Sequence, residues 1–337
     1  MRVRARFWCV LLCAMLMAAC SSGAGQATQS TTPPTATSTT LPSAGTVSAT
    51  ISGLGENTQF DNGIAASDTA IWVHNGEDGT LVRVDPISNR VMATINVGHG
   101  EGGVALGNGS VWVANPVEGT VSRVDSQSNQ VVATIALTAQ DAVQAIAASP
   151  DAVWVTQFNQ DALIRIDPHT NRVVATISSQ SGITGVSFGA GSVWACNHHD
   201  PSEGLAQLNP QTNQIQTQIA VGDKQSMACS SVVALAQTVW TTSFTNREQN
   251  ITLKRIDSAT KTVIAIIPVS TAFPFHFAAN EQGVWLYNDQ NVYRVDPTTN
   301  RLAGMLAIQG TNGVTVAAGS VWVCKSDGTV LRITPAS

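Results

Sequence analysis

The stretch Gly103-Val-Ala-Leu-Gly-Asn-Gly-Ser-Val-Trp-Val-Ala-Asn115, with Gly119-Thr-Val-Ser-Arg-Val-Asp125 and Gln130-Val-Val-Ala-Thr-Ile135 behind it, is one unit of a repeat. It consists of short runs rich in β-branched residues, bounded by Gly, Asn and Asp. This pattern predicts β-strands joined by tight turns. We expect four strands per unit: Gly103 to Leu106, a second around Trp112, a third ending at Asp125 and a fourth ending at Ile135.

A tryptophan in the second strand marks each copy of the unit. Successive tryptophans are 40, 42, 40, 46, 45 and 37 residues apart. A period near 40 residues indicates a repeat array, and four strands per unit arranged around an axis form a β-propeller blade. The seven positions are Trp72, Trp112, Trp154, Trp194, Trp240, Trp285 and Trp322.

The turn between the third and fourth strands has a recurring sequence. Examples are Asp85-Pro-Ile-Ser-Asn89, Asp167-Pro-His-Thr-Asn171 and Asp296-Pro-Thr-Thr-Asn300. The Asp side chain can accept backbone N–H groups ahead of it, Pro fixes φ, and Asn tolerates the left-handed region. These residues therefore predict a defined turn rather than an open loop.

The two ends of the chain predict how the ring closes. The last unit stops after its third strand, at Leu331-Arg-Ile-Thr-Pro-Ala-Ser337. The missing fourth strand is Thr46-Val-Ser-Ala-Thr-Ile-Ser52, which precedes the first unit. Pairing these ends removes the open sheet edges that an unclosed array would expose. We predict an all-β, seven-bladed propeller over residues 46–337, closed by an N-terminal strand that completes the last blade.

The repeat resembles the YVTN-type seven-bladed propeller family. The matching text is Val111-Trp-Val-Ala-Asn115, Gly119-Thr-Val-Ser-Arg-Val-Asp125 and Asn171-Arg-Val-Val-Ala-Thr-Ile177, with Trp in place of the family's usual Tyr. The resemblance spans residues 46–337. It implies the propeller fold and an extracytoplasmic binding role, but a fold of this kind does not define an activity.

Residues 1–19 are predicted to be a lipoprotein signal peptide. Arg2, Arg4 and Arg6 precede an apolar stretch too short to span a membrane. Leu16-Met-Ala-Ala-Cys20 resembles a bacterial lipobox, which implies cleavage before Cys20 and lipid on that residue. We therefore expect a protein anchored by lipid in the cell membrane and facing the extracytoplasmic side; the alternative is an ordinary cleaved signal and a free secreted protein.

Residues 20–45 are predicted to be a disordered linker. The stretch from Ser21 to Gly45 has no charged residue, and 12 of its 25 residues are Ser or Thr. Such a segment cannot bury enough apolar surface to fold. Removing residues 1–19 takes away three arginines and no acids, so the net charge moves from −5 to −8. An acidic protein of this kind has no electrostatic basis for binding nucleic acid.

An arginine occupies the same third-strand position in six units, two residues before the turn. Six copies that face six directions cannot form one asymmetric site. We expect them to cover blade surfaces or to stack near the Trp rings. The six residues are Arg83, Arg123, Arg165, Arg255, Arg294 and Arg332.

A specific site is expected where the repeat is broken. The two longest tryptophan intervals place insertions in blades 4 and 5, and the connections there fall on one face of a propeller. Binding residues concentrate in loops on rigid scaffolds. We predict a site for a protein, peptide or glycan ligand at the irregular positions His198, His199, Asp200, Asp223, Lys224, Arg247 and His276. His74 and His99 should share this face, and His169 should lie opposite.

No cofactor, metal centre or catalytic set is predicted. His198, His199 and Asp200 together could ligate a metal, but adjacent His residues in an exposed loop are usually only solvated. Cys196 and Cys229 should lie near one face, where a disulfide is allowed in an oxidising compartment; buried free thiols are the alternative. Cys324 is three blades away from this pair.

An enzymatic alternative comes from a second resemblance, to the streptogramin lyase group of propellers. That group carries a Glu three residues after the Trp, and His and Glu from late blades hold a metal and act as base. Here His276 resembles the group's histidine nine residues before Trp285. The positions that would hold Glu are Asn75, Asn115, Gln157, Asn197, Ser243, Asn288 and Lys325. Without the acids, a lyase is less well supported than a binding module.

Overall fold

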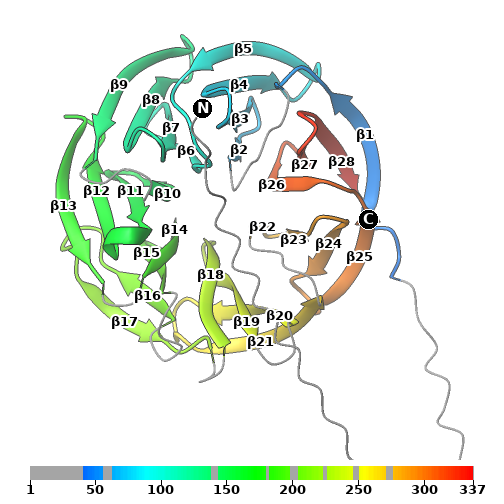
Figure 1. Ribbon diagram of the computed structural model, residues 1–337. Coiled ribbons are helices and arrows are strands. Elements are labelled where there is room, and N and C mark those ends of the chain that lie inside the picture. Colours follow the sequence, from blue (N-terminus) through cyan, green and yellow to red (C-terminus); the bar gives the residue numbers. More distant parts are fainter. Residues whose placement is uncertain are drawn as a thin grey trace, which may run out of the picture. The chain divides into compact units, whose positions relative to one another are not determined.

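Each repeat forms one four-stranded antiparallel sheet, and seven such sheets surround a central axis, as a seven-bladed β-propeller (Figure 1). The computed structural model describes residues 41–55, 63–137, 143–179, 182–197, 204–222, 226–245, 250–270 and 276–336. The predicted signal peptide, Cys20 and the linker up to residue 40 lie outside this range. Within the described residues, no helix has the length and apolar character needed to cross a bilayer.

Each blade has an inner, a second, a third and an outer strand. The inner strands are β2 (Ile64–Ala66), β6 (Val104–Gly107), β10 (Val143–Ser149), β14 (Ile183–Gly189), β18 (Ser226–Ala234), β22 (Phe277–Asn280) and β26 (Thr311–Ala317). The second strands are β3 (Ile71–Asn75), β7 (Ser110–Asn115), β11 (Ala152–Gln157), β15 (Ser192–Asn197), β19 (Thr238–Thr245), β23 (Gly283–Tyr287) and β27 (Ser320–Lys325).

The third strands are β4 (Thr80–Asp85), β8 (Thr120–Asp125), β12 (Ala162–Asp167), β16 (Leu205–Leu208), β20 (Asn250–Asp257), β24 (Asn291–Asp296) and β28 (Val330–Pro335). The outer strands are β5 (Arg90–Asn96), β9 (Gln130–Ala136), β13 (Arg172–Ser178), β17 (Ile215–Ile219), β21 (Val263–Ser270), β25 (Arg301–Ala307) and β1 (Gly45–Ile51). A single 3-10 turn, η1 (Phe158–Gln160), links β11 to β12.

The antiparallel order divides the connections between two faces. Connections from second to third strands, and from each outer strand to the next inner strand, emerge on what we call the loop face. Connections from inner to second strands and from third to outer strands emerge on the opposite side, the turn face.

The closure predicted from the chain ends is confirmed. Strand β1 pairs antiparallel with β28, so the seventh sheet has the order β1-β28-β27-β26 (Figure 1). The ordered domain begins upstream of the predicted start at Thr46, because β1 starts at Gly45 and Ala44 is already buried.

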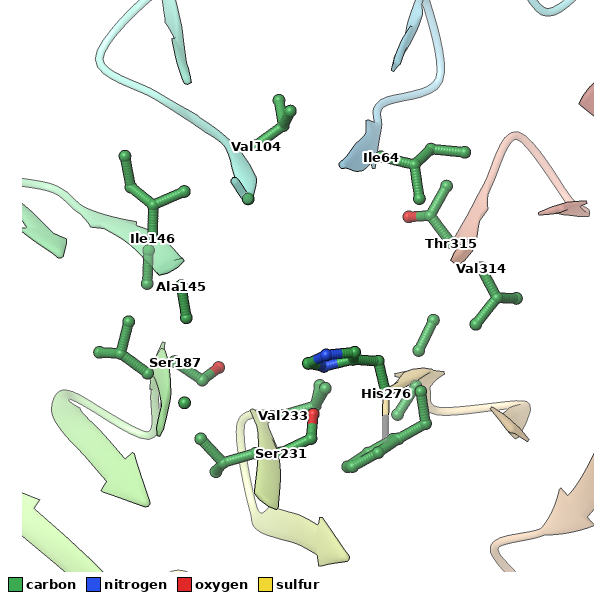
Figure 2. A pocket seen from close by; sticks show the side chains of 18 of the residues that line it. Ile64, Val104, Ala145, Ile146, Ser187, Ser231, Val233, His276, Val314 and Thr315 are labelled. Carbon is green, nitrogen blue, oxygen red and sulfur yellow. The ribbon is translucent and has the colours of Figure 1, made fainter. Parts of the chain in front are cut away.

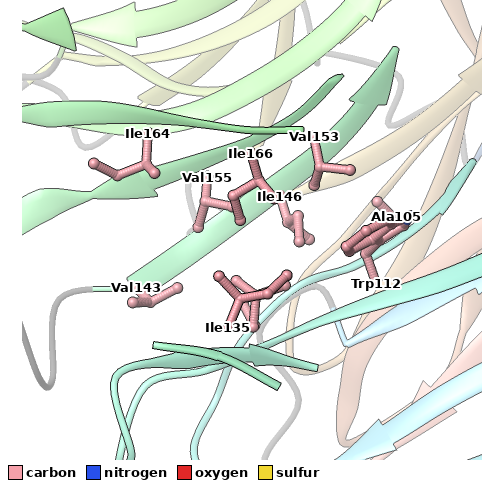
Figure 3. Packing of buried hydrophobic residues seen from close by; sticks show 11 residues of the cluster. Ala105, Trp112, Ile135, Val143, Ile146, Val153, Val155, Ile164 and Ile166 are labelled. Atoms are coloured by element: carbon pink, nitrogen blue, oxygen red, sulfur yellow. The ribbon is translucent and has the colours of Figure 1, made fainter. Parts of the chain in front are cut away.

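The hydrophobic core lies between blades rather than inside them. The cluster at the junction of blades 2 and 3 joins Trp112 and Ile135 of one sheet to Val143, Val155 and Ile166 of the next (Figure 3). Equivalent clusters fill the other six junctions. All seven repeated tryptophans are nearly completely buried. The tryptophan period therefore marks the junctions that hold the ring together.

The repeated arginines stack on the tryptophans, one of the two roles expected for them. In each of the six blades the guanidinium carbon lies 5.0–5.8 Å from the centre of the Trp ring. In blade 2, Arg123 Nη1 also donates to Pro168 O at 2.5 Å and to Asn171 Oδ1 at 2.9 Å. In blades 1, 2, 5 and 7 the arginine thus fastens its own blade to the turn of the next.

The turns from third to outer strand have the predicted chemistry. Asp85 Oδ1 accepts the N–H groups of Ile87 and Ser88, both at 2.8 Å. Asn89 takes the left-handed conformation with φ of 56°. Hydrogen bonds from Ser88 and Ile87 hold the pKa of Asp85 below its ordinary value. The Asp of each such turn is accordingly a structural acceptor.

Candidate functional site

Most of the seven predicted ligand-binding residues lie outside the described part of the chain. Only His276 among them is described. It ends the connection from blade 5 to blade 6 and directly precedes β22. The remaining six are His198, His199, Asp200, Asp223, Lys224 and Arg247, and their predicted role stays a prediction.

His276 breaks a ring of small residues around the axis. Its counterparts in the other blades lie two residues before the inner-strand residue that pairs with the Trp. They carry a side chain of two heavy atoms at most: Gly63, Gly103, Ala145, Gly185, Ser231 and Gly313. At this level of the axis, therefore, blade 6 alone contributes a large polar group.

The residues of this ring around the axis are small because the inner strands of neighbouring blades lie close together. Gly103 N donates to Gln144 O of the next blade at 2.9 Å. A Cβ on Gly103 would lie 3.2 Å from the same oxygen, and a Cβ on Gly313 would lie 3.2 Å from Ile64 Cγ2. A side chain on Gly103 or Gly313 would crowd the neighbouring blade, whereas the side chain of His276 has space in the centre.

An axial cavity of about 270 Å³ lies among the inner strands, and His276 lines it. Figure 2 shows the imidazole extending into the space between Ser187, Ser231 and Val314. The walls are otherwise aliphatic side chains and Phe277, with three hydroxyl groups, and His276 is the one titratable group in the described lining. The lining thus combines aliphatic side chains with polar atoms that make up the larger part of its exposed surface, and such polar groups can orient a ligand.

His74 and His99 are on the loop face, as the strand order implied, and both belong to the junction of blades 1 and 2. His74 is buried: its Nδ1 lies 3.2 Å from Gly102 O and its Nε2 lies 3.0 Å from Gly98 O. Burial lowers the pKa of His74 below its ordinary value. The neutral ring has one N–H and donates to one of the two carbonyls. His74 therefore supports the Gly98–Gly102 connection from inside.

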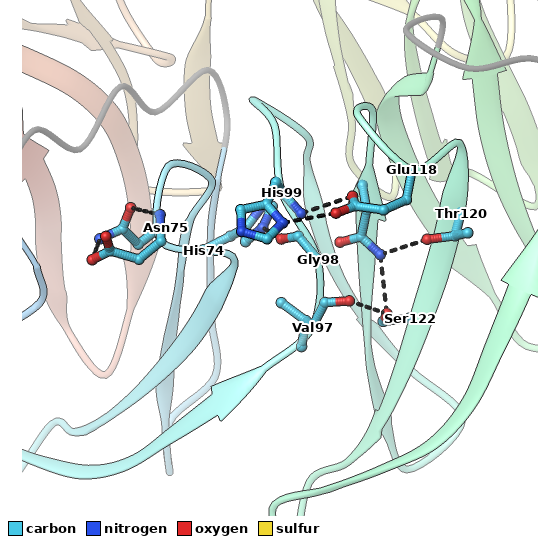
Figure 4. Close-up of polar contacts among 10 residues, drawn as sticks. His74, Asn75, Val97, Gly98, His99, Glu118, Thr120 and Ser122 are labelled. Carbon is cyan, nitrogen blue, oxygen red and sulfur yellow. Dashed lines mark hydrogen bonds and ion pairs between the residues drawn. The ribbon is translucent and has the colours of Figure 1, made fainter.

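His99 supports the same connection from outside. Its Nδ1 lies 2.7 Å from Glu118 Oε1, and its backbone N–H donates to Glu118 Oε2 at 2.8 Å (Figure 4). Desolvation raises the pKa of Glu118, but the hydrogen bonds from His99 outweigh it and leave that pKa below its ordinary value. Glu118 was not singled out from the sequence. A signal exists, since it stands in the connection from second to third strand opposite His99.

Cys196 and Cys229 form a disulfide in the structure, with their Cα atoms 5.2 Å apart. It joins the end of β15 in blade 4 to β18 in blade 5, on the side of the loop face. Cys324 is a buried free thiol whose pKa is raised by burial. No group of three His, Cys, Asp or Glu residues that could hold a metal ion occurs within the described ranges.

Comparison with known proteins agrees with the propeller architecture. The model of a repeat of unknown function, DUF6923, matches residues 76–243. No curated protein matches the chain significantly.

Several solved structures are similar to this chain. Hydrazine synthase of Kuenenia stuttgartiensis aligns with a TM-score of 0.72 at 15% identity, over 83% of this chain and 96% of that chain. Virginiamycin B lyase from Staphylococcus aureus gives 0.67 at 14% identity, over 86% and 99%. A streptogramin B lyase gives 0.68 at 15% identity, over 85% and 97%. At these identities the likeness shows the fold alone.

Proposed function

We propose that the protein is a lipid-anchored, extracytoplasmic binding module that holds a protein, peptide or glycan ligand on its loop face, above the axial cavity. The observation behind this proposal is the position of His276. It is the described member of the predicted binding set, and it is also the residue that extends into the axial cavity. A break in the repeat and an imidazole in the axial cavity thus coincide at one residue.

The size of the cavity limits what it can hold. Sites for drug-sized ligands usually enclose about 300–1,000 Å³, so about 270 Å³ suits one side chain or ring of a larger ligand. We propose that one side chain or ring of the ligand enters the cavity and that a polar atom of this group meets His276. The loops that contain Asp223, Lys224 and Arg247 would then contact the rest of the ligand.

The anchoring half of the proposal rests on the sequence of residues 1–45. Cys20 in its lipobox-like context would hold the protein at the membrane, and the Ser/Thr-rich segment would act as the tether. Cell fractionation tests this directly: Cys20→Ser should move the protein from the membrane fraction to the soluble extracytoplasmic fraction. Unchanged membrane retention would contradict lipid anchoring at Cys20.

The ligand half can be tested by thermal-shift screening of the full chain, because a ligand that binds only the folded state raises the Tm by mass action. For any hit, His276→Ala should weaken binding about three- to tenfold, the usual effect of losing one hydrogen bond of about 0.5–1.5 kcal/mol. His169→Ala is the matched control, since His169 is an exposed histidine on the turn face. Equal affinities of the two variants would place the site elsewhere.

A lyase activity is the second candidate, because His276 resembles the histidine of the streptogramin lyase group and two such lyases share the fold. A general acid and a general base require two suitably placed groups, and the described cavity lining supplies one. Incubation with virginiamycin B separates the candidates. Consumption that is lost in His276→Ala would favour a lyase, whereas an unchanged substrate would favour binding alone.

A further inference from the structure

Blade 7 lacks the covalent turn that connects the third strand to the outer strand in the other blades. The outer strand of blade 7 is β1, so no turn connects it to β28, where the chain ends. In blades 2 and 5 the repeated arginine donates to that turn of the following blade, as when Arg255 Nη1 meets Pro297 O at 2.5 Å. In blade 6, Arg294 Nη1 donates instead to Ala336 O, near the C-terminus. The chain end thus replaces the missing turn as an acceptor.

The residues just before β1 complete this replacement by docking on blade 6. Met305 N in the outer strand β25 donates to Pro42 O at 2.9 Å, and Ala44 N donates to Met305 O at 3.2 Å. Ser43 forms a parallel bridge with Met305, and Ala336 N donates to Ala44 O at 3.0 Å. Residues 42–44 therefore lie along the outer edge of blade 6, held there by one parallel bridge and two backbone hydrogen bonds.

Gly304 makes room for the docked segment, residues 42–44. A Cβ at residue 304 would lie 2.7 Å from Ala44 Cα and 2.8 Å from Ala44 N, distances that real Cβ atoms do not reach. Gly304 pairs with Arg294, and the equivalent partners of the third-strand position in the other blades all have a Cβ. They are Ala93, Ala133, Ala175, Thr217, Ala265 and Ala49. Only the blade that receives the segment has glycine.

The docked segment is also part of the core between blades 6 and 7. Ala44 is buried in the cluster that contains Trp285 and Tyr287 of blade 6 and Leu331 and Ile333 of blade 7. Backbone hydrogen bonds on one side and apolar packing on the other thus fix the same residue.

We propose that the outer edge of blade 6 at Gly304 is a strand-docking site whose occupant is this chain's own segment Pro42–Ala44. The docked segment, together with Ala336, serves as a non-covalent replacement for the missing turn of blade 7. Ring closure then depends on blade 6 as well as on the pairing of β1 with β28. An N-terminal segment that is pulled from outside transmits the load to two blades instead of one.

The unmodified full chain provides the first test, by residue-resolved hydrogen exchange. Met305 N–H should exchange at least tenfold more slowly than Thr134 N–H, its counterpart on β9, which is the outermost strand of its sheet. Equal exchange rates at Met305 and Thr134 would overturn the proposal, because the docked segment would then give no protection.

The second test is Gly304→Ala in the full chain, which should displace residues 42–44. We expect the protection of Met305 N–H and Ala44 N–H to fall at least tenfold and the Tm to fall by several degrees. Ala133→Ser, which adds one heavy atom at the equivalent position of blade 2, should leave the Tm within about a degree. Retained protection in Gly304→Ala would refute the proposal.

A third variant covers the case in which Gly304→Ala fails to fold. Ala44→Asp puts a charge at the buried position of the segment and leaves β25 unchanged. It should remove the protection of Met305 N–H while the amides paired between β24 and β25 stay protected. Retained protection of Met305 in this variant would equally overturn the docking site.

Discussion

At the junction of blades 2 and 3 the cation over the tryptophan comes from the blade that contains the tryptophan, whereas at the junction of blades 4 and 5 it comes from the next blade. Arg123 lies 5.0 Å from the centre of the Trp112 ring and reaches forward to Pro168 and Asn171. In blade 4 the arginine is replaced by Gln207, which donates to Ser192 Oγ at 2.8 Å. Lys261 of blade 5 lies 5.2 Å from the centre of the Trp194 ring instead.

The exchange is reciprocal at the level of sequence position. Lys261 occupies the left-handed turn position, with φ of 63°, that holds Asn in five other blades, including Asn171 and Asn300. The pair Arg and Asn has thus become Gln207 and Lys261, with the positive charge moved across the junction. A lysine is less suited to this conformation than asparagine. A cation thus lies over each of the seven Trp rings, whether its own blade or the next blade supplies it.

The largest expected effect concerns a feature that both junctions share, namely complete four-stranded sheets. Deleting Thr46 to Ser52 removes most of β1 and leaves β28 as an unpaired edge in blade 7. We expect a marked loss of stability or solubility, because unpaired edges expose hydrogen-bonding groups and promote aggregation. Thermal melting of the purified protein checks this. A Tm within a degree or two of the intact protein would mean that β1 is dispensable for closure.

The second prediction concerns the ring under the cation. Trp154 is fully buried at the junction of blades 3 and 4, and its Nε1 donates to Ser149 Oγ at 3.1 Å. Trp154→Ala should cost about 3–5 kcal/mol of unfolding free energy, as truncation of a buried aromatic does. Denaturant titration measures it. A cost below about 1 kcal/mol would show that the junction does not depend on the aromatic ring.

The third prediction tests the exchange itself. Arg123→Ala removes a stacked cation and three charge-assisted hydrogen bonds, to Ser110, Pro168 and Asn171, so we expect a loss of about 2–3 kcal/mol. Lys261→Ala should cost less, about 1–2 kcal/mol, since it removes the stacking on Trp194 and one hydrogen bond to Ser258 O.

The double variant Gln207→Arg with Lys261→Asn provides the control for this comparison. It restores the arrangement of the other blades and should be at least as stable as the natural pair. If Gln207→Arg alone is as stable as the double variant, then the two positions are independent and the reciprocal interpretation is wrong.

The smallest expected effect concerns the turn acids. Asp125 accepts N–H groups from Ser128 and Gln127, and these bonds hold its pKa below the ordinary value. In blade 4 the neutral Asn209 accepts equivalent bonds at 2.8 and 3.1 Å. The stability from Asp125 is therefore present above the unfolded-state pKa of about 4 and disappears as the pH falls through the lower folded-state pKa. Asp125→Asn should make the turn resemble that of blade 4.

Melting curves of Asp125→Asn and the unmodified chain at pH 7 and at pH 3 check this. The unmodified chain should have a slightly higher Tm at pH 7, and the difference should shrink at pH 3. A difference that grows as the pH falls would mean that the carboxylate of Asp125 opposes the fold.

The architecture could be predicted from the sequence because every blade satisfies the same packing requirement. Trp112, its arginine and the Asp turn recur at near-constant spacing. The pattern can therefore be recognised across the repeats even where a single copy departs from it. The closing strand could be recognised because Thr46 to Ser52 matches the fourth strand of a unit but precedes the first unit. The exchange at Gln207 and Lys261 was not predicted, because each residue alone resembles an ordinary deviation from the repeat.

The candidate site was much less accessible from the sequence. His198 and Arg247 were selected because they interrupt the repeat. An interruption shows that blade packing does not dictate the residue at that position, but it does not show which ligand or contact does. His276 is different, because the equivalent position in the other blades holds Gly, Ala or Ser. Its large side chain can therefore be recognised as a departure at a defined place in the blade. Glu118 was overlooked since its partner, His99, lies in a different connection.

The hydrogen bond between Ala336 and Ala44 has a practical consequence for protein engineering. It places the C-terminal residues beside the start of the ordered domain, so a short linker could join them and the chain could be reopened at another turn. Circular permutants tolerate new termini in exposed turns, and the turn at Ser126 to Asn129 is one such place. A protein fused to the C-terminus would leave the ring beside the first residues of β1.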